Sequence, residues 1–277
     1  MTTQQEKAQA FQALHARERA FVIPNPWDAG TARILASLGF EALATTSLGV
    51  ANVLGRGDGT GAVTADDILE NCRVIAAATD LPVSADLENC YADAPREAAG
   101  MIRRAADAGM VGGSIEDYTG DPAKPFYDFN HAVERVQAAV EAARALPFPF
   151  VLTARAENHI RGNDDLDDTI RRLQAFETAG ADVLYAPGLK DLETIRTVVS
   201  AVGKPVNIVM GMADPDITLD QLSAAGVRRI SVGGALSRLA LAAFLKGARE
   251  MRQDGTFTFI RDMVSFGELQ NLFGGTT

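Results

Sequence analysis

The sequence predicts one closed (β/α)8 barrel, a TIM barrel, and three observations support this fold class. Eight short apolar segments recur at intervals of roughly 20 to 40 residues, each followed by a longer segment with helical periodicity, which is typical of a parallel sheet. Several helical segments end in glycine just before the next strand, where a helix terminus needs a left-handed residue. Composition does not change along the 277 residues, so a single barrel domain over residues 1–277 is expected.

The expected strands are short runs rich in β-branched and aromatic residues. In chain order they are AFVIPN (20–25), EALATTS (41–47), LPVSADLE (81–88), VGGSIED (111–117), FPFVLTARAE (148–157), ADVLYAP (181–187), KPVNIVMG (204–211) and RRISVGG (228–234). A doubly wound open sheet is the weaker alternative, because no G-x-G-x-x-G motif opens a helix after the first strand.

The expected helices carry apolar residues at helical spacing and follow the strands one by one. They lie at 29–39, 65–80, 94–109, 130–146, 165–180, 191–203, 218–226 and 235–255. Residues 1–20 form a further, polar amphipathic helix rather than a signal peptide.

Charge and hydropathy exclude two classes of partner. The formal net charge of −10 repels phosphate backbones, and no basic patch is interleaved with aromatic residues, so nucleic acid is not expected. No apolar run approaches the roughly 20 residues that span a bilayer, so no membrane association is expected and a cytoplasmic location follows. Cys72 and Cys90 lack metal-finger or redox spacing and are expected to be partly buried free thiols.

Polar residues gather where the expected strands end, which is where a barrel of this kind carries its catalytic groups. They are Asp28, Thr45, Thr46, Ser47, Asp86, Glu88, Glu116, Asp117, Arg155, Glu157 and His159. Strand side chains alternate, so Asp86 and Glu88 project to the same side and repel each other unless a cation lies between them. Mg²⁺ suits a site formed by Asp86, Glu88 and Glu116.

Each of these groups also has a plainer interpretation. Acids at strand ends often cap the next helix, and Asp117 is a candidate for that role. Arg155 ends the fifth strand among apolar residues, so its guanidinium needs partners. The carboxylate of a small anionic substrate is one such partner, and an internal ion pair with Glu116 or Glu157 is the other.

At these residues the chain resembles the isocitrate lyase/phosphoenolpyruvate mutase superfamily, over about residues 15 to 255. The similar segments are NPWDAGTARILASLGFEALATTSLGVANVLGRGD, LPVSADLENCY, SIEDYTGDPAKPF, LTARAE and AGADVLYAPG. The resemblance implies a Mg²⁺-dependent barrel enzyme that binds a 2-oxo acid or its enolate, as a tetramer whose last helices are exchanged between paired subunits. By position it implies metal-linked acids at Asp86, Glu88 and Glu116, and a carboxylate and oxo-group site at Arg155 and at Ser47, Leu48 and Gly49.

The sequence departs from the family pattern in ways that bear on the reaction. The lyase branch has a Lys-x-Cys-Gly-His loop, and the segment YTGDPAKPFYDFN has no cysteine. The mutase and phosphonopyruvate hydrolase branch follows its acid pair with lysine, where this chain has Tyr118. The second metal-linked acid is usually aspartate followed by Gly-Tyr-Gly, whereas Glu88 here precedes Cys90, Tyr91 and Ala92, so Glu88 is expected to reach the ion through a water molecule.

The expected function is a Mg²⁺-dependent lyase that acts on a small 2-oxo acid through a metal-stabilised enolate, with carbon–carbon cleavage by retro-aldol reaction or decarboxylation. Phosphonopyruvate hydrolase or mutase chemistry and a noncatalytic 2-oxo acid sensor are the alternatives. A Schiff-base aldolase needs a lysine at a strand end, and the lysines considered, Lys124, Lys190, Lys204 and Lys246, fall in loops or helices.

The proton donor or acceptor is expected among Asp58, Tyr118, Glu157 and His159. Asp58 is favoured, because it lies in the glycine-rich segment GRGDGTG (55–61), which can close over a ligand. The catalytic set is therefore Asp58, Tyr118 and Arg155. His159 is assigned to substrate binding with Ser47, Leu48, Gly49, Asp86 and Arg155.

The C-terminal segment is unusually apolar. Its large apolar residues are Phe257, Phe259, Ile260, Met263, Phe266, Leu269, Leu272 and Phe273. Helices over about 235–277 are expected to pack on a neighbouring subunit in a homodimer or homotetramer, and folding back over the same barrel is the alternative.

Overall fold

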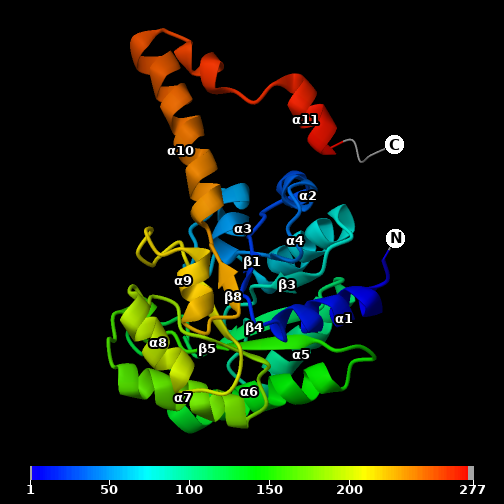
Figure 1. Cartoon of the computed structure of the whole chain (residues 1–277), viewed down its shortest axis with the longest axis vertical. Coiled ribbons are helices and arrows are strands. Elements are labelled where there is room, and N and C mark those ends of the chain that lie inside the picture. The colour runs from blue at the N-terminus through cyan, green and yellow to red at the C-terminus, as the bar shows by residue number, and fades with distance from the viewer. Residues whose placement is uncertain (1, 274–277) are drawn as a thin grey trace.

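The computed structural model describes residues 2–273 and forms an eight-stranded parallel barrel (Figure 1). The strand order is β1-β8-β7-β6-β5-β4-β3-β2. The strands are β1 (Phe21–Ile23), β2 (Leu43–Ala44), β3 (Val83–Ala85), β4 (Gly112–Glu116), β5 (Val151–Arg155), β6 (Val183–Tyr185), β7 (Val206–Val209) and β8 (Arg229–Ser231). Each lies within an expected segment, so the predicted fold class is confirmed.

The seam between β1 and β2 closes the barrel. The amide of Ala44 donates to the carbonyl of Pro24 at 3.1 Å, and the Asn25 side chain donates to the carbonyl of Thr45 at 3.0 Å. Asn25 also accepts from the amides of Val232 and Gly233, beyond β8. These bonds join the two ends of the sheet, so a doubly wound open sheet is wrong.

Helices alternate with the strands around the barrel. They are α1 (Gln4–His15), α2 (Ala29–Ser37), α3 (Ser47–Leu54), α4 (Ala65–Ala78), α5 (Pro95–Asp107), α6 (Phe129–Arg144), α7 (Leu166–Thr178), α8 (Leu192–Ser200), α9 (Leu219–Ala224), α10 (Ala235–Arg249) and α11 (Phe266–Phe273). Asp28 caps α2, since its carboxylate accepts from the amide of Thr31 at 2.7 Å. Asp28 is therefore a helix cap, the plainer of the two roles for strand-end acids.

Helix α3 is a difference from the sequence prediction, which extended the second strand to Ser47. The strand β2 ends at Ala44, and α3 begins at Ser47 after an extended Thr46. Gly55 ends this helix in the left-handed conformation, with φ of 64°. The helix therefore directs its amino terminus towards the carboxyl ends of the neighbouring strands, where it bears on the site.

Helix α1 covers the amino-terminal end of the barrel. Its Phe11 and Leu14 are buried in one cluster with Phe21, Val111 and other residues at the starts of the strands. The ring of Phe11 leaves no room for a side chain at Gly112, where an added Cβ would lie 2.8 Å from the ring. Apolar packing thus closes the barrel at the amino-terminal ends of the strands. The polar side chains lie at the carboxyl ends.

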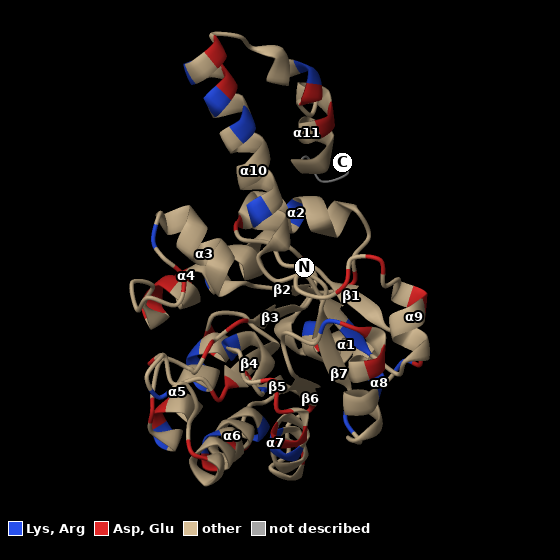
Figure 2. Ribbon diagram, turned by 90° about the vertical axis from the view of Figure 1, so that its left-hand side faces the viewer, with Lys and Arg blue, Asp and Glu red and all other residues tan. Residues whose placement is uncertain are grey.

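The C-terminal segment forms an arm that stands away from the barrel (Figures 1 and 2). Helix α10 runs outward, and α11 returns towards α2, where Phe273 lies near Gly30. Phe259 packs on Gly247 of α10, so the segment that follows α10 folds back against this helix. Many large apolar side chains of the arm remain exposed, among them Leu239, Phe244, Phe257, Ile260, Met263 and Phe266.

Two other expectations concern cysteines and membranes. Cys72 and Cys90 are free thiols, and both are buried completely rather than partly. Within residues 2–273, no helix combines the length and apolarity that crossing a bilayer requires.

Replacing Phe11 by alanine should lower the free energy of unfolding by about 3 kcal/mol, because it leaves a cavity under a fully buried ring. Urea unfolding followed by circular dichroism measures this. The matched control is Leu38→Ala, whose side chain is 63% exposed and whose loss should cost less than about 0.5 kcal/mol. Equal losses in the two variants would contradict the sealing role of α1.

Candidate active site

A cavity of about 880 Å³ opens at the carboxyl ends of the strands. It is lined by most of the side chains that the sequence singled out, namely Ser47, Leu48, Asp58, Asp86, Glu88, Glu116, Tyr118 and Arg155. They come from strand ends and from the loops that follow, which is the catalytic face of such a barrel. The fold therefore brings together residues that lie far apart in the sequence.

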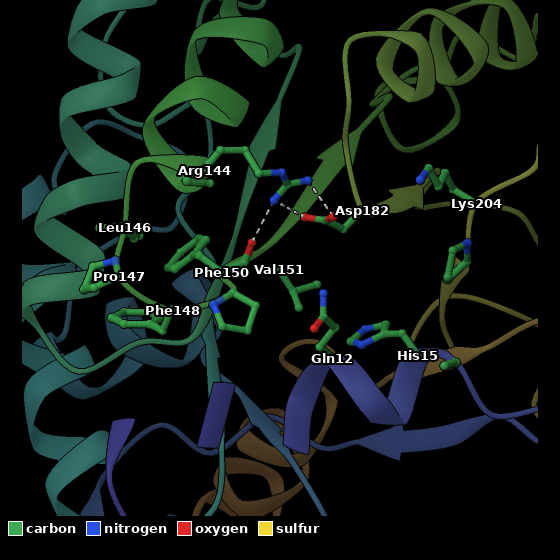
Figure 3. Close-up of a pocket in the computed structure, with 14 residues that line it drawn as sticks. Gln12, His15, Arg144, Leu146, Pro147, Phe148, Phe150, Val151, Asp182 and Lys204 are labelled. Carbon is green, nitrogen blue, oxygen red and sulfur yellow. Dashed lines mark hydrogen bonds and ion pairs between the residues drawn. The ribbon is translucent and has the colours of Figure 1, made fainter. Parts of the chain in front are cut away.

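A second cavity, of about 660 Å³, lies at the amino-terminal end of the barrel (Figure 3). It is bounded by α1 and by the segments that lead into β5, β6 and β7. Arg144 reaches across it to both carboxylate oxygens of Asp182, at 2.7 and 3.2 Å. This end of a barrel serves stability rather than chemistry, and its Arg144 is already paired, so we place the site in the first cavity.

Arg155 is the centre of the charged wall of the first cavity. Its Nη1 donates to Asp86 Oδ1 at 2.9 Å, and its Nη2 lies 3.2 Å from Glu116 and 2.9 Å from Glu157. The guanidinium also lies 5.0 Å from the centre of the Tyr185 ring. The internal ion pairs considered from the sequence are thus present, and Asp86 joins them. Nε also donates to Glu157 at 3.0 Å, and since Nη1 carries two N–H groups and donates one to Asp86, its second N–H is left.

Asp86 is held between Arg155 and the amino terminus of α3. The amide of Ser47 donates to its Oδ2 at 3.1 Å, and the Ser114 hydroxyl lies 3.5 Å from its Oδ1. The amide of Asp86 in turn donates to the hydroxyl of Thr45 at 2.9 Å. The free amides at a helix amino terminus favour negative charge, so this position suits a carboxylate and an anionic ligand beside it.

Glu88 lies in a strained turn. Its φ is 48°, and Cys90 and Tyr91 have φ values of 60° and 53°, which are uncommon for residues with a side chain. Cys90 falls where the family pattern has glycine, so the left-handed conformation here is held without the residue that adopts it most readily. Burial, with repulsion from Asp86 and Asp58, raises the pKa of Glu88 to about 7.

Glu116 and Glu157 form the buried floor of the charged wall. Both are almost completely buried, and each lies near Arg161 as well as Arg155, at 3.9 Å and 3.5 Å from its Nη2. Burial raises the pKa of Glu116, although the charge of Arg155 acts in the opposite direction. The two arginines therefore compensate for acids that would otherwise be costly to bury.

Asp117 is not a helix cap, so that prediction is wrong. Its carboxylate accepts from the amide of Glu157 at 2.8 Å and pairs with Arg172 at 3.0 Å, away from solvent. Burial raises its pKa to about 6, against the effect of these partners. Asp117 ties β4 to the segment after β5 and so fixes the position of Glu157.

Tyr118 and Asp58 line the cavity from two different loops. The guanidinium of Arg161 lies 3.5 Å from the centre of the Tyr118 ring, and a bridge between Tyr118 and Phe126 anchors the loop that they enclose. Asp58 lies in the exposed glycine-rich loop but faces the cavity. Burial of its carboxyl group and the charge of Asp86 raise the pKa of Asp58.

Two residues assigned to substrate binding lie outside the lining of the cavity. Gly49 packs behind the wall, where an added Cβ would lie 2.7 Å from Thr46 and 2.8 Å from Trp27. His159 has its Nδ1 3.7 Å from Asp164, a partner on the outer side, and burial lowers the pKa of its imidazole. Gly49 and His159 therefore support the site from behind.

The family model of phosphoenolpyruvate phosphomutase matches residues 11–252. The chain belongs to the phosphoenolpyruvate phosphomutase family. This confirms the resemblance to the isocitrate lyase/phosphoenolpyruvate mutase superfamily and makes the chain a member of a superfamily of enzymes.

Relatives of this phosphomutase family member carry several activities. A 2-methylisocitrate lyase of Escherichia coli is 30% identical over 92% of this chain and 88% of that protein. An oxaloacetate decarboxylase of Ectopseudomonas mendocina is 30% identical over 89% of this chain and 85% of that protein.

Solved structures agree with the fold. One from Burkholderia cenocepacia, provisionally described as a lyase/mutase, is 57% identical over 98% of this chain and 97% of that chain, with a TM-score of 0.95. A phosphonopyruvate hydrolase solved with oxalate and Mg²⁺ is 23% identical over 99% of this chain and 95% of that chain, with a TM-score of 0.86.

The acids of the cavity suit a divalent cation that keeps most of its water molecules better than a cation enclosed by protein ligands. In the described part of the chain, no three His, Cys, Asp or Glu side chains are grouped closely enough to enclose an ion. Mg²⁺ commonly binds through one or two carboxylates and keeps several waters. Burial and, after it, repulsion from Asp86 raise the pKa of Glu88 and of Asp58, and a cation beside Asp86 would relieve that repulsion.

Several residues line the cavity but were not assigned to the site from the sequence, among them Tyr91, Arg161 and Tyr185. Tyr185 ends β6, so an aromatic hydroxyl at a strand end was a usable signal. Tyr91 and Arg161 lie in irregular segments, and their direction depends on the turn after β3 and on the 3-10 helix η1 (His159–Arg161).

Glu88→Gln should reduce the pH dependence of stability in the presence of EDTA. The pKa of Glu88 is about 7 in the folded protein against 4.5 for an ordinary glutamate, so the folded state binds the proton more tightly. The free energy of unfolding must then fall as pH rises from about 4.5 to about 7, and the glutamine variant should lose less. Urea titrations at about pH 5 and about pH 8 measure this. Glu70→Gln, on the exposed face of α4, should retain the wild-type slope.

Proposed function

We propose that the chain is a Mg²⁺-dependent lyase that cleaves a carbon–carbon bond in a small 2-oxo acid through an enolate. The observation that carries the proposal is the contact of Arg155 with Asp86 on the wall of a cavity that Glu88, Glu116 and Asp58 also line. A guanidinium and a cluster of acids at one strand end are the groups needed to bind a carboxylate beside a divalent ion.

The residues of the cavity have separate tasks in this proposal. Asp86 would hold a Mg²⁺ ion, with Glu88 and Glu116 as the further carboxylates beside it. Arg155 binds the substrate carboxylate through its remaining N–H. The amide of Ser47 holds Asp86, and the amide of Leu48, in the first turn of α3, is the one proposed to face the oxo group. When bound, the ion supplies positive charge that stabilises negative charge developing on oxygen.

The bond that breaks lies between C3 and C4 of the acid. Its electron pair stays on C3 and spreads into the C2 carbonyl, giving the enolate, while C4 leaves as carbon dioxide or as a carbonyl compound. C3 then takes a proton. Asp58 faces the cavity from a glycine-rich loop, burial and the charge of Asp86 raise its pKa, and it is the group proposed to exchange this proton. Tyr118, held by Arg161, lines the cavity from the loop after β4.

The other assignments have less support. No lysine is found among the cavity-lining residues in the described part of the chain, which disfavours a Schiff-base aldolase. Binding without turnover would instead assign the chain to the noncatalytic 2-oxo acid sensors, and release of phosphate from phosphonopyruvate would assign it to phosphorus–carbon chemistry.

We also propose that the arm formed by α10 and α11 packs on a second copy of the chain, in a homodimer or homotetramer. Phe244 and Phe266 are 70% and 79% exposed in the isolated chain, and similar side chains continue along the arm. A monomer rarely exposes so much contiguous apolar surface, and an exchanged arm would bury it against its counterpart.

Arg155→Lys should lower kcat/KM for oxaloacetate by about 100-fold or more, because it keeps the charge but loses the planar donors that orient the substrate. It should slow the Mg²⁺-dependent exchange of pyruvate methyl protons for deuterium, followed by NMR, in the same way. The control Arg171→Lys changes an exposed arginine of α7 and should leave both rates unchanged. Wild-type rates in Arg155→Lys, or exchange that persists in EDTA, would contradict the proposal.

Phe244→Glu should weaken self-association by at least about 10-fold, because a charge would be buried in an apolar interface. Light scattering during gel filtration measures the mass. Val74→Glu, on the outer face of α4, is the control and should retain the wild-type mass. A wild-type chain that is monomeric at micromolar concentration would contradict the proposed assembly.

A further inference from the structure

The walls of the cavity differ in chemistry. The wall formed by the ends of β3, β4 and β5 carries the carboxylates and Arg155. The wall formed beyond β7 and β8 is apolar and consists of Val209, Met212 and Val232, with Gly211 between them. An added Cβ at Gly211 would lie 2.5 Å from the carbonyl of Val232, so this apolar wall is closely packed.

Arg238 lies at the outer edge of the apolar wall, in the first turn of α10, and also lines the cavity. Arg155 and Arg161, the other arginines of the lining, each lie within 4.0 Å of at least two carboxylates. Arg238 has no carboxylate at that distance among residues 2–273, so its charge is free for a ligand.

The first turn of α10 is fixed against the substrate-binding segment. The side chain of Asn52, on α3, donates to the hydroxyl of Ser237 at 2.9 Å. Leu48 lies so close to Gly234 that an added Cβ there would be 2.4 Å away from it. The position of Arg238 is therefore set relative to α3 rather than left to a loose surface helix.

The order of the strands places Arg155 and Arg238 across the mouth from each other. Starting from Arg155 at the end of β5, the sheet continues through β6 and β7 to β8, after which α10 begins. Tyr185, Val209 and Val232 line the cavity along this path. A ligand that reaches from one arginine to the other must therefore pass along an apolar surface.

We propose that Arg238 and the apolar wall form a subsite for the fragment that leaves, and that this fragment is itself a 2-oxo acid with a short alkyl group. The inference rests on the proposed function and selects retro-aldol cleavage, since carbon dioxide needs neither a cation nor an apolar surface. The substrate class is a 4-hydroxy-4-alkyl-2-oxo dicarboxylate. Its C4 hydroxyl gives up a proton, the C3–C4 bond breaks with its pair left on C3, C4 becomes the new carbonyl carbon, and C3 is protonated.

Two matched compounds test the subsite: 4-hydroxy-4-methyl-2-oxoglutarate and 4-hydroxy-2-oxopentanoate, which differ by one carboxylate in place of hydrogen on C4. The wild-type enzyme with Mg²⁺ should cleave the dicarboxylate with the higher kcat/KM. Arg238→Gln should lower the ratio of the two kcat/KM values by about 10- to 100-fold, the effect expected for one charged hydrogen bond. Arg238→Lys should recover part of the ratio, and Arg249→Gln, at the far end of α10, should keep the wild-type ratio.

The possible outcomes distinguish failure of the proposed subsite from failure of the proposed lyase activity. If the wild-type enzyme cleaves both compounds equally well, or Arg238→Gln slows both to the same extent, the subsite is overturned while the lyase stands. If neither compound is cleaved and yet pyruvate methyl exchange depends on Mg²⁺, the subsite is again overturned. If that exchange is also absent, the proposed lyase itself is overturned.

Discussion

The contact of one guanidinium with three carboxylates is the constraint on which the site depends. Arg155 lies on β5 and holds Asp86 and Glu116 from the two preceding strands, together with Glu157 from its own. Several acids buried this deeply would be expensive without it, because each loses its hydration. The ion network therefore sets the spacing of the strand ends that line the cavity.

The backbone around this network is arranged to deliver polar groups within a short distance. The strand β3 has three residues, after which Asp86 follows directly and the chain turns through left-handed residues at 88, 90 and 91. The strand β2 has two, and α3 begins almost at once, so its free amides meet Asp86. Short strands followed by tight turns thus bring polar side chains together at the carboxyl ends of the strands. The ion pair of Asp117 with Arg172 fixes the segment after β5 on the side away from the cavity.

The sequence was sufficient for the eight strands, because each is an apolar run that only a buried parallel sheet can satisfy, and for Asp86, Glu116 and Arg155, which end those strands. It was not sufficient for α3, Asp117, Gly49 or His159. The direction of these groups is decided by contacts with distant residues, such as Asp117 with Arg172 and Gly49 with Trp27, which no local pattern contains. Asp58, in an exposed loop, was found from its glycine-rich surroundings and from the family resemblance of that segment, because the loop has no strand pattern that could place it.

The helix that covers the amino-terminal end of the barrel has a kinetic consequence. Phe11 and Leu14 pack beneath the strands, so the cavity opens at the carboxyl ends of the strands. Ligands enter and leave through this one opening. A ligand bound at the floor of the cavity therefore cannot exchange with solvent while another ligand occupies the rim.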